Sequence, residues 1–289
     1  MADLDCLGKT LFHNRLERLG ESDDETEISE LMHSEKEGYA YNELVTHIPL
    51  LSIDSPRRVM ILGGGSLYTA REILKHPTIE SIDVVDYDPS VTEFVIRNYD
   101  TRQSEIRDDA RVTVRCVDVR QFLNEVAEGG YDAVIDDLID LVRPEDRWVL
   151  ELYPSIARSL NGGGFFGTYL YPSWFHRQLN QLIVTSLSQS GFRSIFVTEE
   201  SVFTYSWPEG FTAYLIATPS DSMSADELNR SLSHNFKRRA LITRQFRPDI
   251  HSLVPIRQHP SFATSSLPSA SDVRGSTSNP ASRELEAER

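Results

Sequence analysis

Three carboxylates, Asp136, Asp137 and Asp140, follow an apolar run near the middle of the chain. The run 131–135 predicts a buried strand, so these side chains are expected at the carboxyl edge of a sheet, where open α/β folds place their ligands. Crowded carboxylates raise one another's pKa, which suits a group that accepts a proton. An amine, with a pKa near ~10, must lose a proton before it attacks carbon, and such a carboxylate can take it. The alternative is a solvated acidic loop.

A glycine run supplies the second chemical signal, because Gly63, Gly64 and Gly65 end an apolar stretch and Asp86 ends the next one. This spacing predicts a strand, a tight turn and a helix, with an acidic group placed to hold a ribose diol. Glycines let a ligand approach the backbone where any Cβ would collide. Tyr68 stands where a dinucleotide fingerprint has its last glycine, which favours S-adenosylmethionine (AdoMet), a nucleoside without phosphate. The alternative is a glycine-rich turn that binds nothing.

The elements that position these groups alternate between strand and helix from residue 57 to residue 219. The predicted strands lie at 57–62, 82–86, 112–117, 133–135, 164–169, 194–197 and 212–217. This pattern predicts an α/β fold with a mostly parallel seven-stranded sheet, an antiparallel last strand and helices on both faces. Such a Rossmann-like arrangement is typical of class I AdoMet-dependent transferases.

Domain organisation follows from the flanking segments. Residues 1–50 are expected to hold an acidic segment, a short strand near 10–12 and a helix over 39–51. The catalytic domain is expected over 51–262, with a helix predicted at 222–247. Residues 263–289, rich in Ser, Pro, Ala and charge, are predicted to be disordered.

Bulk properties exclude several classes of protein. The net charge of −15 argues against a nucleic-acid partner and would suit a cationic small substrate. Two cysteines are too few for a disulfide framework, and no apolar run reaches membrane-spanning length. We therefore expect a cytoplasmic enzyme without a metal cofactor.

Several separated motifs, in order, resemble the polyamine aminopropyltransferases of the spermidine synthase family. They are the segment 41–50, the glycine turn with 71–77, and the pair Asp137 and Asp140. The likeness runs from residue 39 to residue 262. It implies that Asp137 is the catalytic proton acceptor, that Asp140 helps to hold an amine substrate, and that the protein is a homodimer.

The resemblance also assigns the ligand contacts. The three glycines would approach a sulfonium nucleoside, Asp86 would hold its ribose hydroxyls, and Asp118 would bind its adenine amino group. Tyr205 matches a substrate-pocket tyrosine of the family. Aromatic rings suit a cationic substrate, since a cation over a ring face gains about 0.5–2 kcal/mol. The other residues expected on the amine side are Tyr41, Asn42, Tyr169 and Trp207.

One departure concerns the donor. The family usually reads Gly-Gly-Gly-Asp-Gly-Gly at the turn, whereas this chain continues from its three glycines as Ser66-Leu67-Tyr68. The family aspartate neutralises the amine of decarboxylated AdoMet, but Ser66 has no charge and could donate a hydrogen bond to the carboxylate of intact AdoMet. Putrescine N-methyltransferases, relatives on the same fold, also lack the aspartate.

We therefore expect a spermidine-synthase-like transferase that moves a methyl or amino-carboxypropyl group from intact AdoMet to an amine. Two alternatives stay open. One is an aminopropyltransferase that uses decarboxylated AdoMet and anchors it through Asp136 or Asp140. The other is a catalytically inactive nucleoside-binding homologue.

Overall fold

The protein is described by a computed structural model. The structure describes residues 2–4, 8–18, 25–34, 38–138, 141, 144–171, 173–198, 213–221, 223–244, 246–248 and 252–258. No helix within these stretches is long and apolar enough to cross a membrane.

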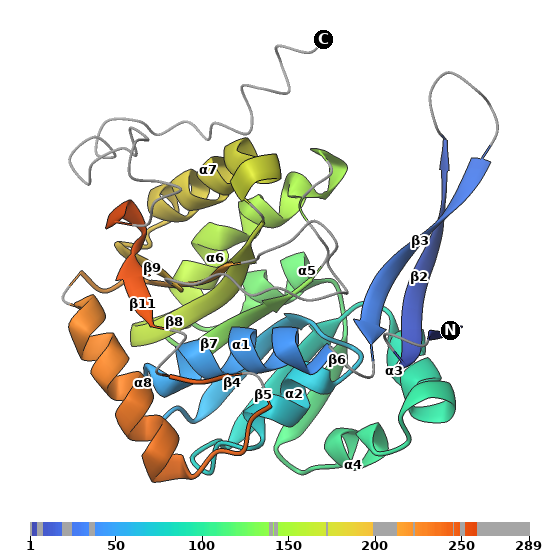
Figure 1. The fold of residues 1–289 in the computed structure, drawn as a ribbon, viewed down its shortest axis with the longest axis horizontal. Coiled ribbons are helices and arrows are strands. Elements are labelled where there is room, and N and C mark those ends of the chain that lie inside the picture. The colour runs from blue at the N-terminus through green and yellow to red at the C-terminus, as the bar shows by residue number, and fades with distance from the viewer. Residues whose placement is uncertain are drawn as a thin grey trace.

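A three-stranded antiparallel sheet forms the N-terminal part, from β1 (Ala2–Leu4), β2 (Gly8–Arg18) and β3 (Glu25–Ser34). Strands β2 and β3 pair along most of their length and project from the rest of the molecule as a ribbon (Figure 1). The sequence predicted only a short strand near 10–12. The observed strands are longer because each supplies the hydrogen-bond partners of the other, a pairing that the pattern of one segment does not reveal.

An eight-stranded sheet forms the core of the main body, in the order β11-β9-β10-β8-β7-β4-β5-β6. Its parallel strands are β4 (Arg58–Gly63), β5 (Ser81–Asp86), β6 (Val112–Cys116), β7 (Tyr131–Asp137) and β8 (Leu160–Leu170).

The other three strands are antiparallel to their neighbours. As predicted for the last strand, β10 (Ala213–Thr218) is antiparallel to both β8 and β9 (Ser194–Thr198). The prediction of seven strands was one short, because β11 (Leu253–Pro255) pairs antiparallel with the edge of β9. A three-residue strand is too short to give a periodic signal in the sequence.

Helices cover both faces of this sheet, as predicted. The chain runs from β4 through β5 to β6 in one direction and then returns to β7 on the other side of β4. Right-handed crossovers therefore place the helix after β4 and the helix after β6 on opposite faces. The helices are α1 (Gly38–Leu51), α2 (Tyr68–Ile73), α3 (Pro89–Phe94), the π-helix η1 (Val95–Tyr99), α4 (Gln103–Arg107), α5 (Val119–Glu125), the 3₁₀-helix η2 (Pro144–Leu152), α6 (Tyr153–Ser159), α7 (Ser173–Gln189), α8 (Ala225–Arg239) and η3 (Ile256–Gln258).

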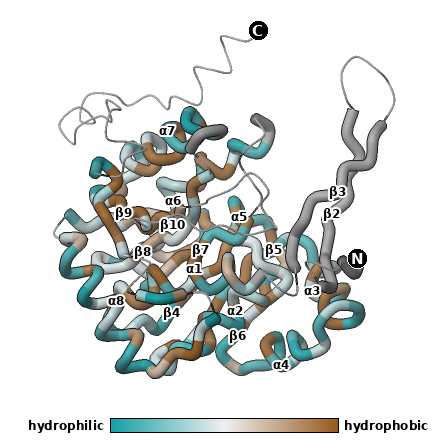
Figure 2. The backbone as a smooth tube through the Cα atoms, in the orientation of Figure 1, coloured by the Kyte–Doolittle hydropathy of each residue, from teal (hydrophilic) through white to brown (hydrophobic). Residues whose placement is uncertain are grey.

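The hydrophobic core lies between the sheet and its helices. In β4, the side chains of Val59, Met60, Ile61 and Leu62 are fully buried, as expected for a strand covered on both faces. Figure 2 shows that hydrophobic residues gather in the central strands. Helix α1 packs closely on β8, where a Cβ on Gly167 would lie 2.9 Å from the Pro49 ring.

Helix α8 is shorter than the predicted helix at 222–247. Ser224 and Glu227 form a reciprocal capping box at its start. The helix ends at Arg239 because Ala240 adopts a left-handed conformation, with φ 50°. The chain then returns to α1, where the Glu43 carboxylate accepts the N–H groups of Arg244 at 2.7 Å and Phe246 at 3.0 Å.

A buried polar chain links α8 to α1 and α2. Arg239 Nη1 lies 2.7 Å from His76 Nδ1, and His76 Nε2 lies 2.9 Å from His47 Nδ1. At the other end, His47 Nε2 faces Glu72 Oε2 at 3.4 Å. A guanidinium can only donate, so His76 Nδ1 is the acceptor and the N–H of His76 lies at Nε2, facing His47.

The buried chain shifts the pKa values of its members. Burial, with the charges of His47 and Arg239, lowers the pKa of His76 well below its usual value. Burial alone would raise the pKa of Glu72, but contacts with His47 and Lys75 outweigh it and lower the pKa to about 2. The contacts of Glu72 with Lys75 and His47 therefore hold α2, which begins at the glycine turn, against α1.

Candidate active site

The glycine turn is pressed against the end of β7. Gly63 and Gly64 both have φ 77°, a left-handed conformation that favours glycine. A Cβ on Gly63 would lie 2.2 Å from the main-chain oxygen of Asp137, and the N–H of Gly64 donates to that oxygen at 3.2 Å. The turn therefore brings the end of β4 and Asp137 together, as the sequence predicted.

Asp86 is oriented by the same turn. Its Oδ2 accepts the N–H of Gly65 at 2.9 Å, and its Oδ1 accepts the N–H of Asp88 at 3.0 Å. A Cβ on Gly65 would lie 2.7 Å from Asp86 Oδ2, so this glycine keeps space at the carboxylate. Each carboxylate oxygen has a second lone pair. The arrangement fits the bidentate contact that a ribose diol requires.

Asp137 ends β7 in an environment suited to a proton acceptor. The Thr69 hydroxyl donates to Asp137 Oδ2 at 2.7 Å. Burial raises the pKa of Asp137 to about 6, against the hydrogen bonds of Thr69 and Tyr41, and the negative charge of Asp86 adds to the rise. At neutral pH the carboxylate is therefore ionised but close to its pKa, which is the condition for general-base catalysis.

Asp136 makes its side-chain hydrogen bonds with residues outside the glycine turn. Its carboxylate is buried, with Oδ2 accepting the Thr168 hydroxyl at 2.9 Å and Oδ1 accepting the N–H of Leu138 at 3.3 Å. Successive side chains of a strand point to opposite faces, so Asp136 and Asp137 point to different sides of the sheet. That Asp136 contacts the donor stays a prediction.

Asp118 is at the carboxyl end of β6, where the sequence predicted it, and it caps α5. Its carboxylate accepts the N–H of Arg120 at 2.8 Å and pairs with the Arg120 guanidinium, which lowers its pKa. That guanidinium lies over the Trp148 ring, 5.0 Å from the centroid. Because β6 neighbours β5, Asp118 and Asp86 occupy the same edge of the sheet.

Ser66 and Leu67 complete the glycine turn. The main-chain oxygen of Ser66 accepts Gln103 Nε2 at 2.9 Å, while its hydroxyl has no partner within the described part of the chain. Leu67 is fully buried and has φ 65°, a left-handed conformation where the family pattern has glycine. Ser66 is thus held by its backbone and keeps a hydroxyl available to a ligand.

The predicted amine side also gathers near Asp137. The Tyr41 hydroxyl donates to the Asp136 main-chain oxygen at 2.8 Å, and its ring meets the edge of Tyr169 at 5.7 Å. Asn42 Nδ2 donates to the Thr69 hydroxyl at 3.0 Å. Asn42 Oδ1 is buried without a partner among the described residues. A buried acceptor of this kind is costly unless a ligand or water satisfies it.

Three predicted residues, Asp140, Tyr205 and Trp207, lie outside the residues that the structure describes. Sequence reasoning, in turn, missed Thr69 and Tyr214. Thr69 contacts Asp137 directly, and Tyr214 in β10 lies 6.3 Å from Tyr41, ring centre to ring centre. Thr69 lies in the first turn of the helix that follows the glycines. That position in the sequence could have indicated a residue close to the site.

Comparison with protein-family models matches residues 38–227 to the spermine/spermidine synthase domain. The chain belongs to the spermidine/spermine synthase family. This family consists of transferases that depend on AdoMet or decarboxylated AdoMet. The resemblance drawn from the separated motifs is thereby confirmed.

Named relatives within the family differ in reaction. Putrescine N-methyltransferase 3 of Nicotiana tabacum is 32% identical over 189 residues, which cover 65% of this chain and 49% of the relative. Spermidine synthase 1 of Hyoscyamus niger is 32% identical over 186 residues, which cover 64% of this chain and 58% of the relative. The chain spans about half the length of the curated relatives it matches.

Solved structures of the family share the fold. The spermidine synthase of Thermotoga maritima superposes with a TM-score of 0.65 at 20% identity, over 82% of each chain. A spermidine synthase in complex with the transition state analogue AdoDATO gives the same values. The α/β architecture with a mixed, mostly parallel sheet is therefore that of the spermidine synthases.

Proposed function

We propose that this chain transfers an alkyl group from an AdoMet-type sulfonium donor to an amine, with Asp137 as the proton acceptor. The observation that carries this proposal is the Asp137 carboxyl itself, which lies against the glycine turn with its pKa raised to about 6. Its partners Thr69 and Tyr41 come from the two helices beside it and orient the carboxylate.

Donor binding would use the carboxyl edge of three neighbouring strands. Asp86, oriented by two backbone N–H groups, would hold the ribose hydroxyls, and Asp118 would bind the adenine amino group. Gly63, Gly64 and Gly65 leave room for the nucleoside because no Cβ projects from the turn. Ser66 would face the propyl arm of the donor with its hydroxyl.

The chemistry requires little more than alignment and deprotonation. The donor supplies an activated carbon bonded to a positively charged sulfur. Asp137 takes the proton of the bound ammonium, which frees the nitrogen lone pair. The N–C bond forms as the C–S bond breaks, its electron pair goes to sulfur, and a neutral thioether leaves. Holding both reactants in line supplies much of the rate enhancement.

The amine would lie among polar and aromatic side chains. Asn42 Oδ1, which lacks a partner among the described residues, is placed to accept an N–H. Tyr41 and Tyr169 would face the cation with their rings, and Tyr205, Trp207 and Asp140 are proposed to complete this side. Their contribution stays a prediction, as does the proposal of a cytoplasmic homodimer.

The transferred group depends on the donor. Ser66 cannot neutralise the amine of decarboxylated AdoMet, so we favour intact AdoMet and transfer of its methyl or amino-carboxypropyl group. Relatives at 32% identity include both a putrescine N-methyltransferase and a spermidine synthase, which supports either reaction equally. Aminopropyl transfer from decarboxylated AdoMet is therefore the second candidate.

Calorimetric titration with AdoMet and with decarboxylated AdoMet tests the assignment. We expect tighter binding of intact AdoMet to the natural chain and a reversed preference in the Ser66→Asp variant, because the new carboxylate repels the donor carboxylate. Ser66→Ala is the matched control and should not reverse the preference. Tighter binding of decarboxylated AdoMet would favour aminopropyl transfer, and binding of neither would favour an inactive homologue.

A further inference from the structure

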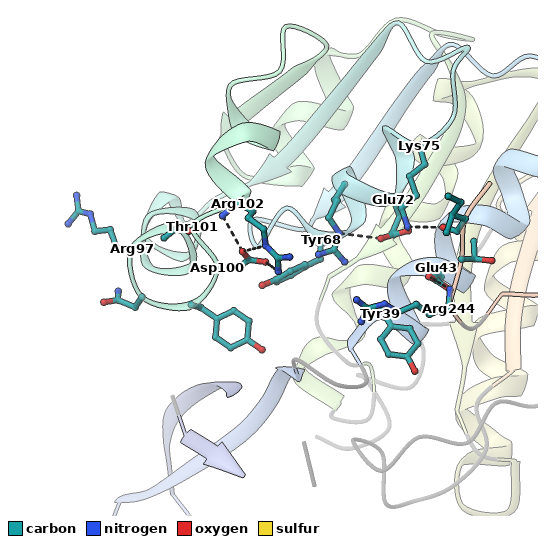
Figure 3. A pocket seen from close by; sticks show the side chains of 15 residues that line it. Tyr39, Glu43, Tyr68, Glu72, Lys75, Arg97, Asp100, Thr101, Arg102 and Arg244 are labelled. Carbon is teal, nitrogen blue, oxygen red and sulfur yellow. Dashed lines mark hydrogen bonds and ion pairs between the residues drawn. The ribbon is translucent and has the colours of Figure 1, made fainter. Parts of the chain in front are cut away.

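A cavity of about 1260 Å³ is lined in part by α2, and Asp137 is not among its lining residues (Figure 3). Its walls come from the start of α1, from one face of α2, from residues 97–102 and from residues 242–244. None of the residues assigned above to the donor or amine lines it. Arg71 and Glu72 are three and four residues after Tyr68 on α2 and so share with it the helix face that lines this cavity, and Lys75 follows just after the helix ends.

The cavity, here called the basic pocket, has a charge opposite to that of the chain. Five basic side chains line it: Arg71, Lys75, Arg97, Arg102 and Arg244. Among the described residues, three acidic side chains do so, although the whole chain carries a net charge of −15. Figure 3 shows Arg97 and Arg102 on one side of the pocket and Arg244 beside Tyr39 on another.

The three acidic groups are already engaged by the protein. Glu43 holds the backbone N–H groups of Arg244 and Phe246. Glu72 is buried and pairs with Lys75 and His47. Asp100 pairs with Arg102, with a 2.8 Å contact between Arg102 Nε and Asp100 Oδ1. Each of these carboxylates therefore already has a protein partner.

Two guanidinium groups are positioned by aromatic rings and keep N–H groups without a partner among the described residues, although Arg71 also pairs with Glu72. Arg71 lies over the Tyr68 ring, 4.8 Å from its centroid, and contacts Glu72 only through Nε at 3.2 Å. Arg244 lies over the Tyr39 ring at 5.2 Å and pairs with no carboxylate of the described residues. Stacking on a ring leaves the edge of a guanidinium free to donate, and that planar edge matches phosphate oxygens.

We propose that the basic pocket binds a small molecule that carries two or more phosphate groups. A single phosphate would gain little from exposed cations in an acidic protein, because salt screens each contact. Several phosphate groups can engage Arg71 and Arg244 together, and the cavity has room for them. The other two guanidinium groups of the lining already pair with carboxylates, Arg97 with Glu93 and Arg102 with Asp100. This inference does not depend on the proposed transferase activity.

Calorimetric titration with inorganic triphosphate, in the presence of EDTA, tests the proposal. We expect one site per chain, at least about tenfold weaker binding in Arg71→Gln and in Arg244→Gln, and weakening by added salt. Arg193→Gln is the matched control, since Arg193 is exposed and pairs with Asp221 elsewhere on the surface. It changes the net charge equally and should bind triphosphate as the natural chain does. Circular dichroism checks that each variant is folded.

Four results would overturn the proposal. They are no binding of triphosphate, equal weakening by Arg193→Gln, equal affinity for orthophosphate and triphosphate, and displacement of triphosphate by S-adenosylhomocysteine, which would place it in the donor site. A peptide with the sequence of residues 21–27, which is highly acidic, is a further competitor. Tighter binding of that peptide than of triphosphate would show that the pocket takes a polypeptide and not a phosphate compound.

Discussion

The two sides of α2 have opposite electrostatic character. Toward the sheet edge, Thr69 contacts Asp137 in a site whose charged groups are carboxylates, while on the other side Arg71 and Lys75 line the basic pocket. A helix of six residues separates the two environments. The comparison shows that net charge, which is strongly negative here, does not decide what each surface of the protein binds.

The difference also lies in how each side was assembled. The acidic site comes from the ends of adjacent parallel strands, which any open α/β sheet brings together. The basic pocket joins segments that the fold places side by side without a shared motif. The acidic site therefore follows from the topology of the sheet, and the basic pocket follows from how the segments of this particular chain pack.

The largest effect is expected from Asp137→Asn on the acidic side. The amide has the same shape but cannot take the proton, so the rate of transfer should fall about 10²–10⁴-fold. Donor affinity, measured by calorimetry, should change little. Arg193→Gln should leave the rate unchanged. Full activity in Asp137→Asn would mean that another group is the base.

Glu72→Gln examines the ion pair behind the basic pocket. The Glu72 side chain is nearly inaccessible and contacts Lys75 and His47, so we expect a loss of about 1.5–3 kcal/mol in the free energy of unfolding. The control is Glu80→Gln, whose exposed pair with Arg57 should contribute at most about 1 kcal/mol. Chemical denaturation measures both. Similar losses in the two variants would contradict the role given to burial.

Acid should destabilise the protein through His76. Its pKa is lowered in the folded state, so below pH 6.5 the unfolded chain binds a proton that the folded protein does not. Stability should be full above pH 6.5 and fall by up to about 1.4 kcal/mol per pH unit below it. Denaturation at pH 7, 6 and 5 measures this slope. His76→Gln should reduce it, and an unchanged slope would assign the effect to other groups.

The smallest effect is expected on the pH dependence of kcat/KM, which concerns the acidic side of α2. In the natural chain kcat/KM should decline as the pH falls through about 6, when Asp137 becomes protonated. Thr69→Val removes a hydrogen bond that favours the carboxylate, so this decline should begin at a higher pH. Thr78→Val removes a hydroxyl that donates to Pro56 and should leave the profile unmoved. Identical profiles for all three proteins would argue against Asp137 as the titrating base.

Sequence reasoning succeeded where spacing along the chain determines position in space. The glycine turn, Asp86 and Asp137 could be predicted because a strand, a turn and a helix put them at one edge of the sheet. The antiparallel last strand could be predicted because the last two strands lie close together along the chain and are joined by a loop.

Sequence reasoning failed where distant pairing or packing decides. The length of the hairpin β2–β3 depends on a partner strand, and β11 is too short to show a period. The contact of Asp136 with Thr168 across the sheet was likewise not visible in the sequence. The basic pocket draws on four separated segments, and no spacing rule joins them.

Leu67 gives the donor turn a property that glycine would not. Its left-handed backbone costs about 1–2 kcal/mol, which its fully buried side chain offsets in the core. The N–H of Leu67 donates to Gly64 at 2.9 Å, and the main-chain oxygen of Gly65 accepts the Thr92 hydroxyl at 2.6 Å. A turn held in this way has few conformations, so less conformational entropy would be lost if it binds the proposed donor. Leu67 therefore preorganises the turn, and a glycine at this position would make donor binding weaker while relieving local strain.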